Sequence, residues 1–256
     1  MSLIDSHCHL TYEPLYSNLT KLISSCKDEN ISHLLSISTN LETSIKSIEI
    51  ANTYENVFTT IGVHPLEIKK SNSNLFKIFE LHKTSKKIIG IGEIGLDFYR
   101  CKDNRSEQID IFEQQIVFAL KNKLPIIIHT RSANNDMHSI IKKYSSQNNT
   151  KFLIHCFSED AVFCKQMINL GCYISFSGIV TFKNAKEIQK SAKIVPLDRI
   201  LIETDSPYLS PEPIRGKPNS PINVKYVAKK ISEIKNIDYE IIENQTTQNF
   251  LNFFSI

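Results

Sequence analysis

Eight short apolar segments alternate with longer amphipathic segments along the chain, and this alternation restricts the possible folds more than any other feature. The apolar segments are rich in β-branched residues and have few polar positions, which is typical of strands buried on both faces of a parallel sheet. The expected strands cover residues 3–6, 33–38, 58–63, 88–92, 125–128, 152–154, 173–176 and 200–204.

The segments between the expected strands have helical periodicity. In 106–122, Ile109, Phe112 and Ile116 recur at intervals of three or four residues, and 223–234 has the same spacing. Strands that alternate with helices indicate an α/β protein, and eight such units predict a closed (β/α)8 barrel of the TIM type. Because a length of 256 residues suits one barrel, we expect a single domain over residues 1–256.

An open doubly wound sheet is the alternative fold, and one motif favours it. Residues 90–95 read Gly-Ile-Gly-Glu-Ile-Gly, which matches the dinucleotide-binding pattern Gly-x-Gly-x-x-Gly. That pattern requires its last glycine to open a helix directly after the strand, whereas residues 96–104 intervene here. Glu93 would also place a carboxylate beside the pyrophosphate. We therefore interpret the match as accidental.

Composition limits the partners and the location of the chain. A net charge of +3 permits an anionic substrate but is too small for a protein that coats nucleic acid by charge alone. No apolar run approaches the roughly 18 residues of a membrane span, so we expect no membrane partner. The six cysteines are irregularly spaced without a Cys-x-x-Cys, which favours reduced thiols and a cytoplasmic location. We expect no signal peptide and infer no obligate protein partner.

Residues of metal-ligand type lie at or beside the ends of the expected strands. His7 and His9 belong to a His-x-His motif, and an extended strand places both imidazoles on one face. Because the carboxyl ends of all barrel strands meet at one mouth, residues that are distant in the sequence are expected to converge there. The complete set of candidate metal ligands is His7, His9, Glu93, His129, His155 and Asp205.

The donor atoms of this set indicate the metal and its chemistry. Four imidazoles and two carboxylates without a thiolate suit Zn²⁺, Mn²⁺, Co²⁺ or Ni²⁺ and, less readily, Mg²⁺. Six ligands suggest two divalent cations, which would lower the pKa of a shared water and stabilise a displacement. Glu93 is the candidate bridge and Asp205 the candidate general base, and both are therefore catalytic candidates. Ordinary turn or N-cap carboxylates are the alternative interpretation.

Two further residues are candidates for substrate binding. His64 ends an expected strand, where it could either donate to a phosphate oxygen or cap the turn before Pro65. Arg131 follows His129 closely and could make a bidentate contact to phosphate, or pair with a neighbouring acid.

The motifs that carry these residues resemble, in order, the signature set of the TatD family of metal-dependent deoxyribonucleases, and in particular its YcfH-like bacterial branch. The resemblance covers essentially the whole chain. The motifs are Ser-His-Cys-His at 6–9, Gly-Val-His-Pro at 62–65, Gly-Glu-Ile-Gly-Leu-Asp at 92–97, His-Thr-Arg at 129–131, His-Cys-Phe at 155–157, Ser-Phe-Ser-Gly at 175–178 and Glu-Thr-Asp-Ser-Pro-Tyr-Leu at 203–209.

The resemblance implies a metallo-dependent hydrolase barrel of the amidohydrolase-like type that binds two divalent cations and hydrolyses phosphoester bonds, in several members as a DNA exonuclease. It assigns His7, His9, Glu93 and Asp205 to the first cation. It assigns Glu93, His129 and His155 to the second. The Arg-Gly-Lys-x-Asn-x-Pro loop of the family further implies substrate contacts from Arg215 and Asn219.

The leading hypothesis is therefore a metal-dependent phosphodiesterase whose nucleic-acid substrate is the ends of single-stranded or frayed DNA. The same barrel also suits hydrolysis of an amide or a carboxylic ester, including cyclic amides and aminoacyl esters. A non-catalytic metal-stabilised binding protein is the third possibility and would need closed coordination. The basic residues Arg131, Arg215 and Lys217 favour phosphate.

Overall fold

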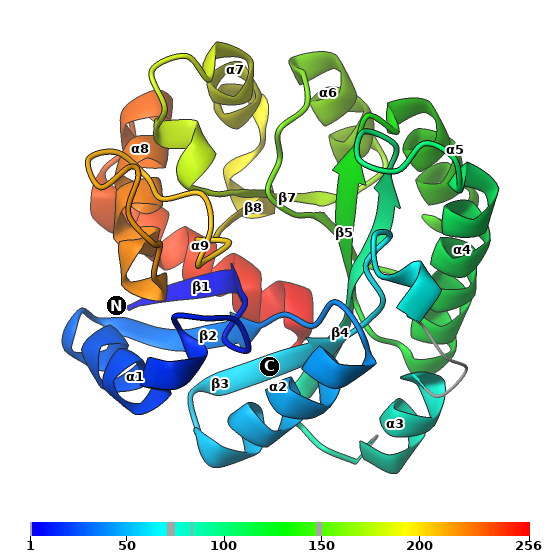
Figure 1. Cartoon of the computed structure of the whole chain (residues 1–256). Helices are drawn as coiled ribbons and strands as arrows, with labels where there is room; N and C mark the ends of the chain where they lie inside the picture. Colours follow the sequence, from blue (N-terminus) through cyan, green and yellow to red (C-terminus); the bar gives the residue numbers. More distant parts are fainter. Residues whose placement is uncertain (1, 71–74, 83, 147–149) are drawn as a thin grey trace.

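Eight parallel strands follow one another around a barrel in the order of the chain (Figure 1). The structure is a computed structural model that describes residues 2–70, 75–82, 84–146 and 150–256. The strands are β1 (Leu3–Cys8), β2 (Ile31–Ser36), β3 (Val57–Ile61), β4 (Ile88–Asp97), β5 (Ile126–Arg131), β6 (Phe152–Ile154), β7 (Tyr173–Phe176) and β8 (Ile200–Ile202).

The first and the last strand meet and complete the ring. Cys8 and Ser206 form a parallel bridge, and the backbone N–H of His9 donates to the carbonyl of Ser206 across 2.8 Å. The N–H of Asp205 donates to the carbonyl of His7 across 2.9 Å. These contacts confirm the predicted (β/α)8 barrel and exclude the open doubly wound sheet, whose edge strands would not pair.

Helices surround the barrel on its outside (Figure 1). The expected helix 106–122 begins one residue earlier, and the expected helix 223–234 is shifted by one residue. The helices of the described residues are α1 (Leu19–Asp28), α2 (Leu41–Thr53), α3 (Leu75–His82), α4 (Arg105–Asn122), α5 (Asn134–Tyr144), α6 (Ala161–Asn169), α7 (Lys186–Ile194), α8 (Val224–Lys235) and α9 (Tyr239–Phe254).

Two central strands are longer than the sequence predicts. We expected them to end at residues 92 and 128, but β4 continues to Asp97 and β5 to Arg131, so that Glu93 and His129 lie inside strands. The ladder continues because Gly95 lets the two backbones approach: a Cβ at Gly95, whose φ is +143°, would lie 2.0 Å from the carbonyl oxygen of His129. Glycines within an apolar run therefore marked close strand contact and not the end of the strand.

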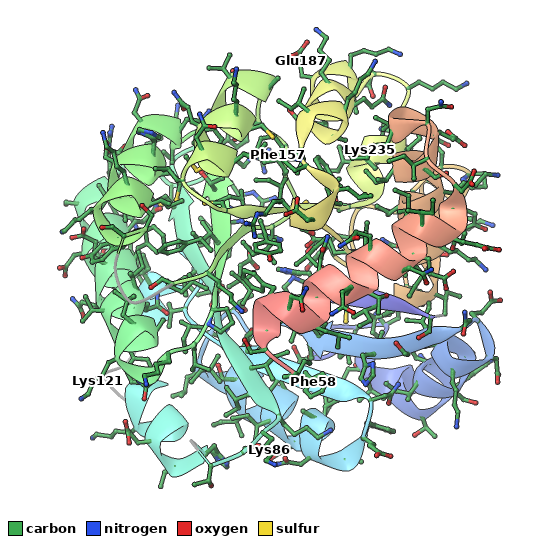
Figure 2. The ribbon with its side chains drawn as sticks, turned by 180° about the vertical axis from the view of Figure 1, so that it is seen from behind. Phe58, Lys86, Lys121, Phe157, Glu187 and Lys235 are labelled. Carbon is green, nitrogen blue, oxygen red and sulfur yellow. The ribbon has the colours of Figure 1, made fainter. Side chains whose placement is uncertain are left out.

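The bottom of the barrel interior is filled by side chains that point inward from the strands. Phe250, Phe253 and Phe254 of α9 complete this cluster, and Figure 2 shows α9 lying across the end of the barrel near Phe58. The barrel is therefore a packed core with a closed bottom, and the space for chemistry is left at the mouth. The strand residues of the cluster are Ile4, Leu35, Phe58, Ile89, Ile127, Leu153, Tyr173 and Leu201.

Candidate active site at the barrel mouth

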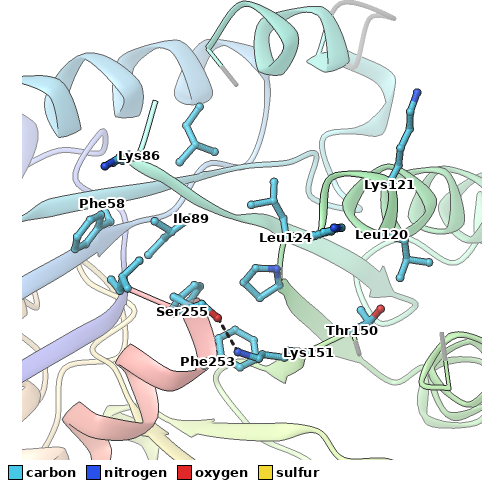
Figure 3. Close-up of a pocket in the computed structure, with 15 residues that line it drawn as sticks. Phe58, Lys86, Ile89, Leu120, Lys121, Leu124, Thr150, Lys151, Phe253 and Ser255 are labelled. Atoms are coloured by element: carbon cyan, nitrogen blue, oxygen red, sulfur yellow. Dashed lines mark hydrogen bonds between the residues drawn. The ribbon is translucent and has the colours of Figure 1, made fainter. Parts of the chain in front are cut away.

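Two large cavities lie at opposite ends of the barrel. The cavity at the closed bottom has a volume of about 990 Å³ and is lined by apolar side chains and lysines, with Lys151 donating to Ser255 Oγ across 2.9 Å (Figure 3). Among the described residues that line it, none has an imidazole or a carboxylate side chain. The mouth cavity, of about 850 Å³, is lined by His9, His64, Glu93, His129, His155 and Asp205. The donor groups for metal chemistry are therefore at the mouth.

Glu93 lies at the centre of the mouth. Its Oε1 is 2.8 Å from Nε2 of His155 and 2.9 Å from Nδ1 of His129. Its Oε2 lies 3.7 Å from Nε2 of His7. Because its two oxygens face histidines from opposite sides of the barrel, this carboxylate is placed between two groups of donors.

Asp205 completes the second group of donors. Its Oδ1 is 3.2 Å from Nε2 of His9 and 3.6 Å from Nε2 of His7. The backbone of Asp205 is left-handed, with φ of 55°, a conformation that aspartate adopts more readily than most residues. The local turn after β8 therefore directs the carboxylate into the mouth, while its N–H completes the ring with β1.

Both central carboxylates are ionised in this environment. Burial alone would raise the pKa of Glu93, but the charge of His155 and the hydrogen bonds with His129 and His155 hold that pKa well below its ordinary value. Burial would also raise the pKa of Asp205, yet the hydrogen bond with His9 keeps it lowered. Ionised carboxylates are the form that binds divalent cations.

The donor atoms fit the coordination of divalent metal ions. Within the described part of the chain, both ring nitrogens of His7 and Nδ1 of His9 are buried without a hydrogen-bond partner, although buried polar atoms normally have one. Two atoms that bind one cation at about 2.1 Å lie roughly 3 to 3.5 Å apart, close to the separations around Glu93 and Asp205. The donor atoms form three groups within 4.8 Å: His7, Glu93 and His155; His7, His9 and Asp205; and His64, Glu93 and His129.

His64 differs from the other histidines of the mouth. The backbone N–H of Leu66 donates to its Nδ1 across 3.1 Å, so that Nδ1 carries no proton and Nε2 does. Burial lowers the pKa of His64 to about 3, and the ring is therefore neutral. Its Nε2, 3.5 Å from Oε1 of Glu93, is consequently a hydrogen-bond donor and not a free metal ligand.

Arg131 reaches the mouth cavity, and its guanidinium lies 4.2 Å from the ring centre of Tyr99. Among the described residues, Arg131 has no ion pair with an acid. Tyr99 is 60% exposed and Arg131 is partly exposed, so both side chains are accessible at the rim. The guanidinium of Arg131 is therefore not paired with a neighbouring acid among the described residues, and it is free to contact an incoming anion.

The structure does not bring the other two substrate-binding candidates to the mouth. The guanidinium of Arg215 lies over the ring of Phe182 at 4.2 Å and 3.9 Å from Glu212. Asn219 is 1% exposed, and its amide donates to the carbonyls of Thr204 and Tyr208. Neither residue lines the mouth cavity. Asn219 instead fixes the loop that follows β8.

Several residues around the ligands have contacts that the sequence did not assign. Tyr12 stacks on His9 with ring centres 4.9 Å apart and planes inclined by 10°. Asp97 and Glu203 contact His129 and His155 from behind. Asp97 and Glu203 lie inside the family motifs at 92–97 and 203–209. Asp97 follows Glu93 by four residues and Glu203 precedes Asp205 by two, and this closeness to candidate ligands is the sequence signal that could have identified them.

A barrel with imidazoles and carboxylates grouped at its mouth defines the class of metal-dependent hydrolases. Within that class, the chain belongs to the TatD family: the family profile described as TatD related DNase matches residues 4–255. The predicted family and fold are thereby confirmed.

Named relatives resemble the chain over its whole length. A protein of Buchnera aphidicola subsp. Baizongia pistaciae, named as an uncharacterized metal-dependent hydrolase, is 39% identical, with 100% of this chain and 97% of the relative covered. YcfH of Escherichia coli K12, which has the same description, is 34% identical, with 100% and 97% covered. The crystal structure of the E. coli TatD homolog YJJV matches with a TM-score of 0.93 at 22% identity, covers 99% of this chain and 98% of that chain, and shows the same fold.

Within the described residues, no helix combines the length and the apolar character needed to cross a membrane.

Proposed function

We propose that the chain is a divalent-metal-dependent phosphodiesterase of the deoxyribonuclease type, which removes nucleotides from the ends of single-stranded DNA. The observation that carries the proposal is the cluster of ionised carboxylates and imidazoles around Glu93, with a neutral N–H donor on His64 beside it. The whole chain, residues 1–256, acts in this proposal as one catalytic domain.

The ligand groups divide between two cations. His7, His9 and Asp205 would hold the first, His129 and His155 would hold the second, and Glu93, which faces both groups, would contribute to each. When bound, Zn²⁺, Mn²⁺, Mg²⁺, Co²⁺ or Ni²⁺ supplies a water of lowered pKa and neutralises phosphate charge. Burial of His7 lowers its pKa, which keeps that ring in the neutral form that binds a metal.

Asp205 is the proton acceptor in this proposal. Its side chain is 14% exposed, against 5% for Glu93, so it is the carboxylate with more access to the substrate space. A pKa below the ordinary value leaves it ionised at neutral pH. It can therefore take a proton from the attacking water while it still contacts His9.

His64 and Arg131 bind the phosphoryl group. A neutral imidazole with its proton on Nε2 donates one hydrogen bond to an oxygen on which negative charge grows. The planar guanidinium of Arg131 offers paired donors that match two phosphate oxygens. Both groups line the mouth cavity.

The rim of the mouth suits unpaired nucleotides. Tyr208 and Tyr99 are 53% and 60% exposed and can stack on bases, an interaction open to single strands. The net charge of +3 does not favour extended contacts along a duplex. The six free cysteines support the cytoplasmic location expected from the sequence.

The test is degradation of single-stranded DNA labelled at its 5′ or 3′ end, with Mn²⁺ or Mg²⁺ added to chelator-treated protein. We expect cleavage by the unaltered chain and its loss in Glu93→Ala and Asp205→Asn. The matched control is Glu187→Gln, which removes an exposed carboxylate on α7 that pairs with Lys190 at 2.6 Å, lies at the periphery of the molecule (Figure 2) and does not line the mouth cavity. Cleavage that survives in both site variants would contradict the proposal.

The alternative hydrolase activity is tested in parallel with an aminoacyl ester and a cyclic amide. The mouth could accept a carbonyl oxygen in place of a phosphoryl oxygen, since the same donors polarise both. Metal-dependent hydrolysis of these substrates, without DNA cleavage, would replace the phosphodiesterase assignment.

A further inference from the structure

Glu203 lies behind His155, on the side of the ring that faces away from the mouth. Its Oε1 is 3.3 Å from Nδ1 of His155, whereas Nε2 of the same ring faces Glu93. Ser175 Oγ donates to the other oxygen of Glu203. Glu203 is completely buried, so this carboxylate is held in one place and leaves one oxygen for His155.

Asp97 has the equivalent position behind His129. Its Oδ2 is 3.2 Å from Nε2 of His129, whose Nδ1 faces Glu93. The backbone N–H groups of Tyr99 and Arg100 donate to Oδ1 across 3.1 and 2.8 Å. Asp97 is 1% exposed, and one oxygen is again left for the imidazole.

The backbone of Asp97 is also anchored by a neighbouring helix. Gln108 of α4 accepts the N–H of Asp97 across 2.8 Å and donates to its carbonyl across 3.1 Å. Main-chain N–H groups therefore fix the carboxylate behind His129, and Gln108 fixes the backbone that carries it. Because the carboxylate of Asp97 is already held in place, it can orient the imidazole of His129 without losing further conformational freedom.

Among the residues that the structure describes, the histidines on the other side of Glu93, His7 and His9, have no such partners. Within the described residues, Nδ1 of His7 and Nδ1 of His9 are buried without a hydrogen bond. Tyr12 stacks on the face of His9 but leaves its Nδ1 unpaired. The two proposed cation sites thus differ in how firmly their imidazoles are held.

We propose that Asp97 and Glu203 are positioning residues that set the affinity of the cation site formed by Glu93, His129 and His155. A carboxylate on the far nitrogen fixes the tautomer, directs the lone pair of the near nitrogen to the cation and makes that nitrogen more basic. The other site, whose imidazoles belong to His7 and His9, depends on the carboxylates of Glu93 and Asp205 instead. The inference rests on the two-cation site of the proposed function, but it does not depend on the substrate.

The test measures metal affinity in the absence of substrate. Chelator-treated full-length protein is titrated with Zn²⁺ in competition with a chromophoric chelator, and the two dissociation constants are determined for the unaltered chain, Asp97→Asn and Glu203→Gln. We expect one dissociation constant to rise about 10- to 100-fold in each variant, while the other changes by less than about threefold. The thermal unfolding temperature of each metal-free variant is measured as well, so that a change in metal affinity can be compared with a change in stability.

Two further variants separate positioning from general damage. Glu243→Gln is the matched control, because Glu243 is a buried carboxylate of α9 that accepts a hydrogen bond from Asn30 across 3.3 Å and, among the described residues, contacts no ligand residue, so both constants should stay the same. Ser175→Ala loosens Glu203 alone and should weaken the same binding step as Glu203→Gln by a smaller factor.

Three results would overturn the proposal. If both dissociation constants were unchanged in Asp97→Asn and Glu203→Gln, or rose together in parallel with a lower unfolding temperature, the two carboxylates would have no site-specific effect and the proposal would be wrong. Binding of a single cation by the unaltered chain would overturn it as well. DNA cleavage has no part in this readout, so a wrong substrate assignment would leave the result intact.

Discussion

The backbone N–H of Leu66 donates to Nδ1 of His64 across 3.1 Å, and this one bond decides which nitrogen of the ring can act in the mouth. With Nδ1 occupied as an acceptor, the neutral ring carries its proton on Nε2, which faces Glu93 at 3.5 Å. A main-chain contact two residues away in the sequence thus turns a histidine beside the ligand cluster into a hydrogen-bond donor.

This geometry predicts that His64→Ala slows catalysis without loss of a cation. We expect kcat to fall by about 10²- to 10³-fold, the usual effect of removing one donor to a developing negative charge. The metal content of the variant, measured by mass spectrometry of the native protein, should equal that of the unaltered chain. Loss of one cation in the variant would show that His64 is a metal ligand.

The lowered pKa of His64 predicts a specific acid sensitivity of the metal-free protein. Burial lowers this pKa from 6.5 to about 3. Below pH 6.5 the imidazole of His64 is therefore protonated in the unfolded chain but remains neutral in the folded chain. The free energy of unfolding therefore falls as the pH decreases through this window, by about 1.4 kcal/mol per pH unit.

Urea denaturation at pH 7 and pH 5, in the presence of a chelator, measures this effect. Between these values the unaltered chain should lose about 2 kcal/mol more than His64→Gln, because the other titrating groups are common to both proteins. Equal losses in the two proteins would mean that His64 is already charged, or is exposed, in the folded state.

Asn219 is predicted to stabilise the loop after β8. Asn219→Ala leaves the carbonyls of Thr204 and Tyr208 without their donor, and we expect a loss of about 1 to 3 kcal/mol in the free energy of unfolding. Chemical denaturation of the two proteins checks this. An unchanged stability together with a raised KM would favour the substrate contact that the family resemblance implies.

Arg131 and Arg215 are predicted to behave differently. Arg131→Met should raise KM for a phosphodiester about 10-fold, which corresponds to about 1.4 kcal/mol of lost phosphate binding. Arg215→Met should leave KM nearly unchanged, because its guanidinium lies over Phe182 away from the mouth. Steady-state kinetics of both variants make the comparison, and a larger effect at Arg215 would show that the loop closes over the substrate.

Much of the fold follows from the sequence, because eight apolar segments separated by helical periods leave few alternatives. The ends of β4 and β5 could not be placed in this way. Glycines such as Gly95 break the apolar pattern, yet they permit the close backbone contact that extends the ladder. Whether a glycine ends a strand or lets it approach its neighbour depends on the facing strand, which the local sequence does not reveal.

The candidate ligands were predictable because residues at the carboxyl ends of parallel strands converge in any closed barrel. The carboxylates behind them were harder to recognise, since the role of Asp97 depends on a ring nitrogen that belongs to another strand. The loop with Arg215 and Asn219 has no periodicity, so nothing in its sequence fixes where its side chains lie. Only the three-dimensional contacts place Asn219 beneath the loop.

The central claim is that cations held around Glu93 drive phosphodiester cleavage at the mouth. The most direct test adds Mn²⁺ stepwise to chelator-treated protein and measures bound metal and nucleotide release from single-stranded DNA in the same samples. The account predicts no release from the metal-free chain, release that grows as the second cation binds, and none from Glu93→Gln at any concentration. Nucleotide release that is independent of bound metal, or that persists in Glu93→Gln, would contradict it.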